Sequence, residues 1–174
     1  MEISIRNAER KDIEAIMLIE NSSFHENIAE SRETFLERTE VFPDGFLVLM
    51  VNGRVIGYIS SELWEYSEDI DVRQFQLEHS IMDTHRSNGS ELYISSIGIL
   101  EEYRGSGYGK ILVSELEKKM IYNYGINSII LIVSENWTAA RRIYEKNGFE
   151  RIQTISGFFH DDNNSDAIVM RKII

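Results

Sequence analysis

Cysteine is absent from the sequence, and proline occurs once in 174 residues. Without thiols the chain has no disulfide framework, no thiolate metal site and no cysteine nucleophile. No apolar run reaches the length of a bilayer-spanning helix, and residues 1–19 carry too many charges for a secretory signal peptide. We therefore expect a cytoplasmic protein with no membrane partner, because a reducing compartment is compatible with the lack of cysteine.

Basic residues are also scarce. The chain has 18 Lys and Arg against 29 Asp and Glu, which gives a formal net charge of −11. Nucleic-acid binding requires a basic surface, so we expect no nucleic-acid partner. Negative charge near a binding site would favour encounter with cationic amines, and elsewhere it serves solubility. With 43% hydrophobic residues, the chain is predicted to form one globular domain over residues 1–174.

The most informative stretch, residues 97–110, has the pattern of a strand end, a polar connection, a glycine-rich turn and the first turn of a helix. Gly105, Gly107 and Gly109 stand at alternate positions, so the backbone can approach a ligand closely. The N–H groups at the helix start have few helical partners and lie at the positive end of the helix dipole, which suits a phosphate. The spacing is neither a P-loop nor a dinucleotide-binding fingerprint. Taken alone, the turn is also compatible with a tight strand–helix connection.

Two segments resemble the motifs of the GNAT family of N-acetyltransferases. Residues 104–109 match the R/Q-x-x-G-x-G/A signature of that family, with Arg104, Gly107 and Gly109 at the diagnostic places. Residues 140–149 resemble its A-x-x-x-Y-x-x-x-G-F segment. The two motifs occur in the right order, and the resemblance extends over about residues 3–174. Within the family, the sequence loosely resembles the arylalkylamine and ribosomal-protein-alanine acetyltransferases.

This resemblance implies the acyl-CoA N-acyltransferase fold of the α/β class. That fold has a mixed, mostly antiparallel sheet flanked by helices, with a splayed parallel strand pair at its centre. The pair would be residues 92–100 and 129–133, and the second is a β-branched run typical of a strand buried on both faces. The helix between them is predicted to end near Gly125.

Local signals place the other elements. Asn52-Gly53 predicts a hairpin, because both residues tolerate a positive φ. Asp12, Ser31 and Asn136 are predicted to cap helices, because their side chains can accept from free N–H groups. Residues 150–156 and 166–173 alternate in polarity and predict a final antiparallel pair.

The resemblance also implies that acetyl-CoA is the co-substrate and that no metal takes part. The pantetheine arm would insert between the splayed strands and bond to the backbone of 97–99. The N–H of Ile99 would donate to the oxyanion, and the pyrophosphate would lie on the glycine turn. Asn136 stands one place before the usual family asparagine, which is Trp137 here, so it is either a helix cap or a pantetheine contact. The predicted cofactor-binding residues are Ile97, Gly98, Ile99, Arg104, Gly105, Ser106, Gly107, Tyr108, Gly109, Lys110, Asn136, Trp137 and Arg141.

Tyr144 matches the family tyrosine that protonates the departing CoA thiolate, and a phenol is a suitable donor. The alternative is an amphipathic core tyrosine. Tyr93 and Ser95 stand where the arylalkylamine enzymes have two strand histidines, and the strand carboxylate of the ribosomal-protein-alanine enzymes falls at Val133. Strand alternation puts Ser95 and Ser96 on opposite faces. Tyr93 and Ser95 are kept as catalytic candidates, and a water-mediated relay could use Glu62, His79, His85 or Glu91, each of which also suits a structural role.

Residues 64–89 give no clean helical or strand period, apart from a short helix expected near residues 72–78. We expect this segment to lie over the acceptor site; the alternative is a contact with a partner or a second copy, so a homodimer is left open. Four aromatic residues would make either an apolar acceptor wall or part of the core: Trp64, Tyr66, Phe158 and Phe159.

Two functions follow from these patterns. The first is acetyl transfer from acetyl-CoA to a primary amine of a small molecule or a protein N-terminus, by direct attack through a tetrahedral intermediate. The second is a member of the same fold that binds acetyl-CoA without turnover, as a sensor or partner-binding module. The intact surroundings of Tyr144 favour the first, and the missing strand histidines favour the second.

Overall fold

The computed structural model describes residues 1–24, 27–160 and 163–174. These residues form a seven-stranded sheet in the order β1-β2-β3-β4-β5-β7-β6. The strands are β1 (Ile3–Asn7), β2 (Phe46–Val51), β3 (Arg54–Trp64), β4 (Glu91–Ile99), β5 (Ser128–Ser134), β6 (Glu150–Ile155) and β7 (Ala167–Ile173). The helices are α1 (Ile13–Ser23), α2 (Arg32–Val41), α3 (Ile81–Thr84), α4 (Tyr108–Tyr124) and α5 (Thr138–Lys146).

Several local predictions are confirmed. Asn52 and Gly53 have φ values of 49° and 79° and join β2 to β3, as an Asn-Gly hairpin turn requires. Ser31 caps α2 by accepting from the N–H of Thr34. Gly125 ends α4 in the left-handed conformation, with φ 62°. The final pair, β6 and β7, is antiparallel.

The Asp12 prediction is wrong. Asp12 precedes α1, but its carboxylate makes no capping bond to that helix. It accepts instead from the Arg6 guanidinium and from the N–H of Glu9. An arginine on the neighbouring strand therefore outcompetes the helix N–H groups, because charged partners make the stronger hydrogen bonds.

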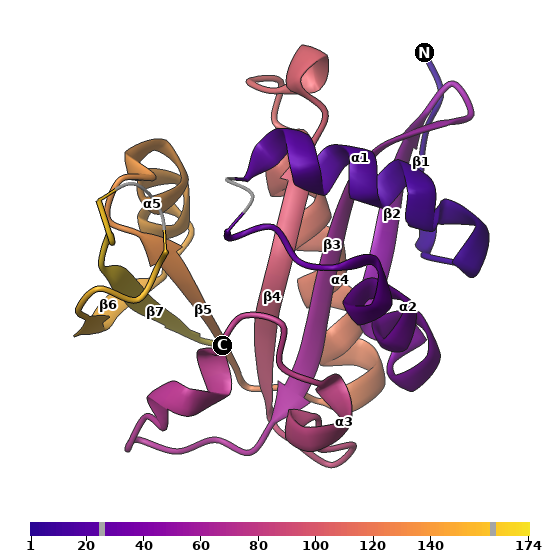
Figure 1. Cartoon of the computed structure of the whole chain (residues 1–174). Helices are drawn as coiled ribbons and strands as arrows, with labels where there is room; N and C mark the ends of the chain where they lie inside the picture. Colours follow the sequence, from indigo (N-terminus) through magenta and orange to yellow (C-terminus); the bar gives the residue numbers. More distant parts are fainter. Residues whose placement is uncertain (25–26, 161–162) are drawn as a thin grey trace.

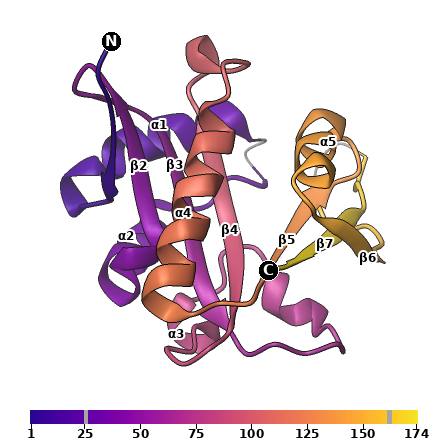
Figure 2. The same cartoon turned by 180° about the vertical axis from the view of Figure 1, so that it is seen from behind.

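The central parallel pair is splayed, as the resemblance implies. β4 and β5 pair only through Glu91–Ser128, Leu92–Ile129 and Tyr93–Ile130. Beyond Tyr93 the two strands diverge, and Figures 1 and 2 show them opening as a V. β5 continues in a full antiparallel ladder with β7, so the sheet consists of two parts that meet at a short seam.

Helices cover both faces of the larger part of the sheet. α1 and α2 lie over one face of β2–β4, and α4 lies over the other (Figures 1 and 2). The buried face of α4 carries Leu112, Leu116 and Met120, which have the helical spacing of its apolar residues. α5 stands beside β5–β7, across the V from α1 and α4.

A β-bulge interrupts the alternation of β4 at Ser95. The register between β3 and β4 shifts there, so Ser95 is an extra residue in the ladder. The Ser95 hydroxyl lies 2.8 Å from that of Ser60, and the Ser96 hydroxyl lies 2.7 Å from that of Tyr58. Tyr58 and Ser60 are two residues apart on β3 and share a face. The predicted opposite placement of Ser95 and Ser96 is therefore wrong, because the bulge turns both hydroxyls to the same side.

Residues 65–90 connect β3 to β4 and are more ordered than the sequence predicts. A 3-10 turn forms at Val72–Phe75, inside the region of the predicted helix, and α3 forms where no helix is predicted. The Phe75 ring is buried and packs edge-on against Trp64, with ring centroids 5.1 Å apart. In the part of the chain that the structure describes, no helix has both the length and the apolar character needed to cross a membrane.

Candidate active site

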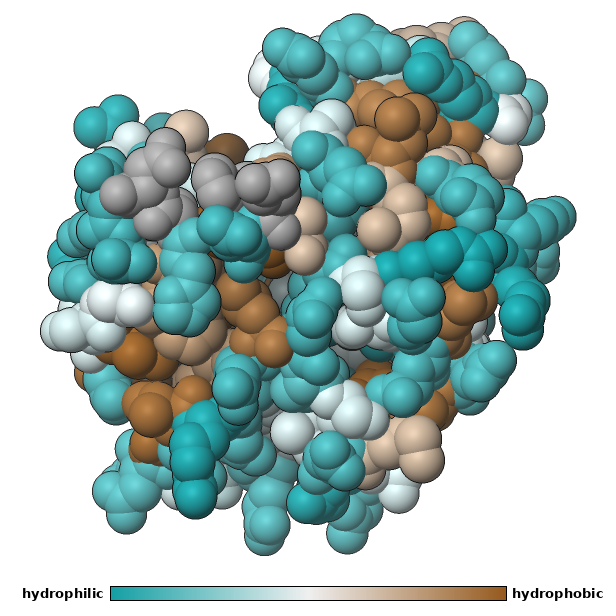
Figure 3. Space-filling model, in the orientation of Figure 1, coloured by the Kyte–Doolittle hydropathy of each residue, from teal (hydrophilic) through white to brown (hydrophobic). Residues whose placement is uncertain are grey.

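A cavity of about 1130 Å³ occupies the gap where β4 and β5 diverge. On the α4 side its wall includes the glycine turn and the first residues of that helix. On the α1 side its wall includes Phe24, Ile28, Leu77 and Phe159. Figure 3 shows the surface hollowed where the two parts of the molecule meet, with hydrophobic atoms along one side of the hollow. The cavity therefore opens between β4 and β5, with the backbone of the glycine turn near α4 and both apolar and acidic side chains near α1.

Most of the predicted site residues are brought together here. Ser106 and Arg141 lie outside the wall: Ser106 is exposed, and the Arg141 guanidinium donates to the carbonyl oxygen of Glu135, 3.3 Å away. The predicted residues that line the cavity are Tyr93, Ser95, Ile97, Gly98, Ile99, Arg104, Gly105, Gly107, Tyr108, Gly109, Lys110, Asn136, Trp137 and Tyr144.

The glycine turn has the geometry of an anion-binding helix start. Gly105 and Gly107 have φ values of 78° and 85°, a region that side chains other than glycine rarely adopt. The first intrahelical bond runs from the N–H of Ile111 to the oxygen of Gly107, at 3.1 Å. The N–H groups of residues 108–110 therefore precede the helical ladder and lie at its positive end. A Cβ at Gly107 would meet nothing within 4 Å, so the backbone conformation requires glycine there and packing does not.

The backbone of β4 presents N–H groups to the gap. The N–H of Leu100 donates to Ile56 on β3, at 2.8 Å. Successive N–H groups of an extended strand point to opposite sides. Those of Ile97 and Ile99 consequently point away from β3, toward the side from which β5 has diverged.

Arg104 braces the glycine turn from within the chain. Its Nε donates to the carbonyl oxygen of Ile99 at 2.9 Å, and its Nη2 donates to the hydroxyl of Ser23 at 3.1 Å. The guanidinium thus connects the end of β4 with the end of α1. Two of the five N–H donors of the guanidinium are therefore used to hold these two elements together.

We expect Arg104→Ala to weaken acetyl-CoA binding by less than about tenfold, which is ~1.4 kcal/mol. The side chain supports the turn, while backbone N–H groups would carry most of the anion contact. Calorimetric titration checks this, with Arg54→Ala as an exposed control. A loss of about a thousandfold, ~4 kcal/mol, would instead identify the guanidinium as the principal anion ligand.

Tyr144 lies half-buried on α5, with its ring edge-on to Phe149 at 5.5 Å between centroids. Burial raises the pKa of its phenol to about 12. The hydroxyl therefore keeps its proton at neutral pH and can donate it to a group in the cavity. This position suits the catalytic role of Tyr144, and that role remains a prediction.

Tyr93 and Ser95 lie where β4 leaves β5. The Tyr93 ring is buried and stacks on Trp64, with centroids 4.2 Å apart. Burial and the nearby charge of Glu62 raise the pKa of Tyr93 well above its usual range, so the phenol stays neutral. Ser95 contacts Ser60, to which Arg38 donates at 3.3 Å. Both candidates therefore carry neutral hydroxyl groups, and in the part of the chain that the structure describes no histidine or carboxylate is hydrogen-bonded to either.

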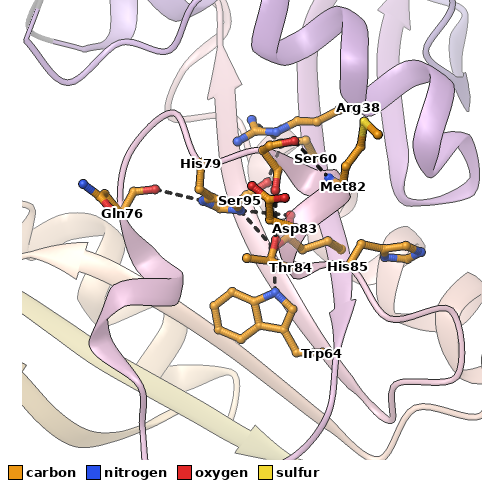
Figure 4. Close-up of polar contacts among 12 residues, drawn as sticks. Arg38, Ser60, Trp64, Gln76, His79, Met82, Asp83, Thr84, His85 and Ser95 are labelled. Carbon is orange, nitrogen blue, oxygen red and sulfur yellow. Dashed lines mark hydrogen bonds and ion pairs between the residues drawn. The ribbon is translucent and has the colours of Figure 1, made fainter.

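Glu62 and His79 form an ion pair beside Tyr93, whose ring centroid lies 6.2 Å from that of His79. Figure 4 shows His79 with Gln76, Thr84 and Trp64 around it. His79 Nε2 lies 2.9 Å and 3.1 Å from the two carboxylate oxygens of Glu62, and its Nδ1 lies 2.8 Å from the carbonyl oxygen of Gln76. Glu62 also accepts from Thr84 at 2.6 Å and from the Trp64 indole at 2.5 Å. Both ring nitrogens of His79 face acceptors, so these contacts favour the imidazolium, which has no lone pair to act as a base.

The pKa values of this pair shift in opposite directions. Burial raises the pKa of Glu62, but the bonds and charge of His79, with Thr84 and Trp64, outweigh it and hold the value below 4.5. Burial lowers the pKa of His79, but Glu62 and the Gln76 carbonyl outweigh it and hold the value above 6.5. The Glu62 contribution to stability is present above pH 4.5 and is lost as pH falls through the folded value. The His79 contribution is present below pH 6.5 and is lost as pH rises through the folded value.

The pair should stabilise the fold most between about pH 4.5 and 6.5. We expect His79→Gln to lower the free energy of unfolding by about 1.5–3 kcal/mol in that window, the scale of a hydrogen bond to a charged group. The difference from wild type should shrink as pH rises above the folded pKa of His79. Urea unfolding across this range checks it, with the exposed His160→Gln as control. A pH-independent difference would contradict the assignment of an imidazolium.

Glu91 and His85 have structural contacts. Glu91 is buried and takes two bonds from Arg171, both at 2.8 Å, and one from Ser128 at 2.7 Å. His85 accepts from the N–H of Leu63 at 3.0 Å and packs on the ring of Phe42. Neither is part of the cavity wall that the described residues form.

The apolar wall differs from the predicted set. Phe159 lines the cavity and packs on Trp137, with centroids 5.1 Å apart, and Trp137 packs on Phe24 at 5.5 Å. Trp64 is core, and Tyr66 lies under the Arg171 guanidinium. Leu77 reaches the wall from residues 65–90, and the position of that segment over the acceptor site stays a prediction.

The cap alternative for Asn136 is wrong, because the N-cap position of α5 is Trp137 and no side chain caps it. Asn136 lines the cavity, which keeps the alternative of a ligand contact.

Three charged residues near the cavity were not singled out from the sequence. Glu20, Glu30 and Arg38 are all at most 5% exposed, and the two glutamates line the cavity. Glu30 and Arg38 form an ion pair. One signal was available for Glu20: it follows Ile13 and Ile16 on the apolar face of its helix, where a solvated carboxylate is out of place.

Residues 13–149 match the Acetyltransferase (GNAT) family. The sheet, split at a parallel pair beside a glycine-rich helix start, is the acyl-CoA N-acyltransferase fold. The chain belongs to the GNAT family and is an N-acetyltransferase.

Relatives agree with this assignment. The chain is 28% identical to an N-alpha-acetyltransferase of Saccharolobus solfataricus, over 98% of this chain and 93% of the relative. Among solved structures, Ard1 of Thermoplasma volcanium superposes with a TM-score of 0.77 at 23% identity, covering 100% of this chain and 99% of that one. Arabidopsis thaliana Naa50, solved with the bisubstrate analogue CoA-Ac-MVNAL, gives a TM-score of 0.74 at 19% identity and covers both chains fully.

Proposed function

We propose that the chain transfers the acetyl group of acetyl-CoA to an α-amino group at the N-terminus of a peptide or protein. The single observation that carries the proposal is the cavity between β4 and β5, which joins the glycine turn to Tyr144 in one space. The name of the Saccharolobus solfataricus relative supports the α-amino acceptor.

The residues suit the donor. The turn at 105–110 offers free N–H groups to a pyrophosphate, and the conformation of Gly107 leaves the approach open. The N–H groups of Ile97 and Ile99 would bond to the pantetheine arm, which takes the place of the strand that β5 no longer provides. The N–H of Ile99 would also stabilise the oxyanion of the tetrahedral intermediate.

The chemistry then needs an acid and an acceptor site. Tyr144 would give its proton to the departing thiolate. The acceptor would enter on the α1 side, where the wall includes the apolar side chains of Phe24, Leu77 and Phe159.

A direct assay tests the proposal. The protein is incubated with acetyl-CoA and a panel of short peptides with free N-termini, beside the same peptides with blocked N-termini and simple amines. Free thiol and the mass of each acceptor are measured. We expect acetylation of the free N-termini. If acetyl-CoA binds but no acceptor causes release of free CoA thiol, the result would favour a sensor that binds acetyl-CoA without turnover. Acetylation confined to simple amines would overturn the proposal that the acceptor is an α-amino group.

A further inference from the structure

We propose that Glu20 is the general base that takes a proton from the acceptor amine; this inference rests on the proposed function. Glu20 lies on α1, is 1% exposed and lines the cavity on the side assigned to the acceptor. It is near the reacting strand, since the Ser96 hydroxyl, which donates to Glu20 Oε1 at 3.2 Å, lies one residue before Ile97.

The carboxylate is held in a fixed orientation. Oε1 accepts from the Tyr58 hydroxyl as well as from Ser96, and Oε2 accepts from the N–H of Glu30 at 2.8 Å. These partners come from β3, β4 and the segment before α2, so three separate elements position one group. A carboxylate fixed in this way loses little freedom when it accepts a further proton.

The other carboxylates of the described cavity wall are already neutralised. Glu30 forms an ion pair with Arg38, and Glu117 accepts from Lys172 at 3.0 Å and 3.2 Å. Within the described residues, Glu20 forms no ion pair with a lysine, arginine or histidine. Three of the candidates from sequence are not part of the described wall: Glu62 is paired with His79, and Glu91 is paired with Arg171. Glu20 is thus the carboxylate of the described wall whose charge no basic side chain of the described residues neutralises.

The surroundings of Glu20 make it a stronger base than an exposed carboxylate. Burial raises its pKa, and the bonds from the Glu30 N–H and Tyr58 reduce this shift without cancelling it. The charge of Glu30 raises the pKa further, and the charge of Arg38 lowers it. A pKa nearer to the working pH is the condition for efficient general-base catalysis.

The protons balance as follows. The acceptor arrives as R–NH₃⁺ and loses one proton to Glu20, which frees the lone pair for attack. The C–N bond forms, the nitrogen of the adduct loses a second proton, and the C–S bond breaks. Tyr144 supplies a proton to the sulfur and is reprotonated. Overall, the nitrogen loses two protons. One is accounted for by the proton on the sulfur of CoA-SH, and the other is released to solvent.

The first test is Glu20→Gln, which keeps the side-chain shape and removes the base. We expect kcat to fall by about 10²–10⁴-fold, with the acid limb of its pH profile lost and the acetyl-CoA thermal shift retained. The matched control is Glu14→Gln on the same helix, where the side chain is 74% exposed. Wild-type kcat and an unchanged acid limb in Glu20→Gln would overturn the inference.

A second variant tests the same role without removing the carboxylate. Tyr58→Phe keeps the buried ring against Phe35 and removes one donor to the ionised form of Glu20. The pKa of Glu20 should rise, so the acid limb should move to higher pH. If Tyr58 is only structural, the substitution would lower stability and leave the acid limb of the pH profile in place. That result would overturn the inference. Failure of wild type to acetylate any acceptor would overturn the proposed function as well, whereas an active wild type with an active Glu20→Gln would overturn Glu20 alone.

Discussion

Replacing Tyr144 with phenylalanine is expected to lower kcat by about 10²–10⁴-fold, the scale of losing a positioned acid. The ring would keep its packing on Phe149, so acetyl-CoA affinity should stay within a few-fold of wild type. Only the phenolic proton is removed, and with a pKa of about 12 that proton is present throughout the neutral range. Steady-state kinetics on a peptide acceptor, together with the thermal midpoint, measures both quantities.

The matched control is Tyr122→Phe on α4, where the side chain is 90% exposed. If Tyr144 is a core residue whose hydroxyl only satisfies a partner, its loss costs about 1 kcal/mol of stability and leaves turnover per folded molecule unchanged. Wild-type kcat in Tyr144→Phe would therefore reject the acid role, and the thiolate would have to leave unassisted or be protonated by water.

Gly107→Glu is expected to abolish the rise in melting temperature that acetyl-CoA gives to wild type. A ligand that binds only the folded state stabilises it by mass action, so loss of the shift reports loss of binding. Two effects combine at this position: the φ of 85° strains any side chain, and the new carboxylate projects where a pyrophosphate would lie.

A second substitution separates these effects. Asparagine tolerates the left-handed conformation better than most residues and adds no charge, so Gly107→Asn should keep part of the shift. Differential scanning fluorimetry with increasing acetyl-CoA measures both variants. An unchanged shift in Gly107→Glu would show that the anion binds elsewhere.

Much of the fold could be predicted because its signals are local. The Asn52-Gly53 turn, the Ser31 cap and the Gly125 end of α4 depend on the residues at those places. The bulge at Ser95 and the order of residues 65–90 could not be predicted, because they depend on partners distant in sequence, such as Ser60 on β3 and Trp64 against Phe75.

The candidate site also has one part that local sequence patterns predict and one part that they do not. The glycine turn and Tyr144 could be singled out from the sequence because their residue types and spacing form a family pattern within short windows. The place of Glu20 beside β4 could not, since tertiary packing alone brings α1 to that strand. Glu20 and Ser96 are 76 residues apart, and only the structure shows that they are bonded.

The short seam between β4 and β5 has a thermodynamic consequence. Three residue pairs join the strands, so few backbone contacts hold the β5–β7–β6 part to the rest of the sheet. A molecule that filled the wedge would bond to β4 on one side and pack against β5 and α5 on the other. It would connect the two parts of the sheet as well as react, and release of the product would remove this connection. Binding of such a molecule would therefore raise the stability of the folded chain, and its release would lower it.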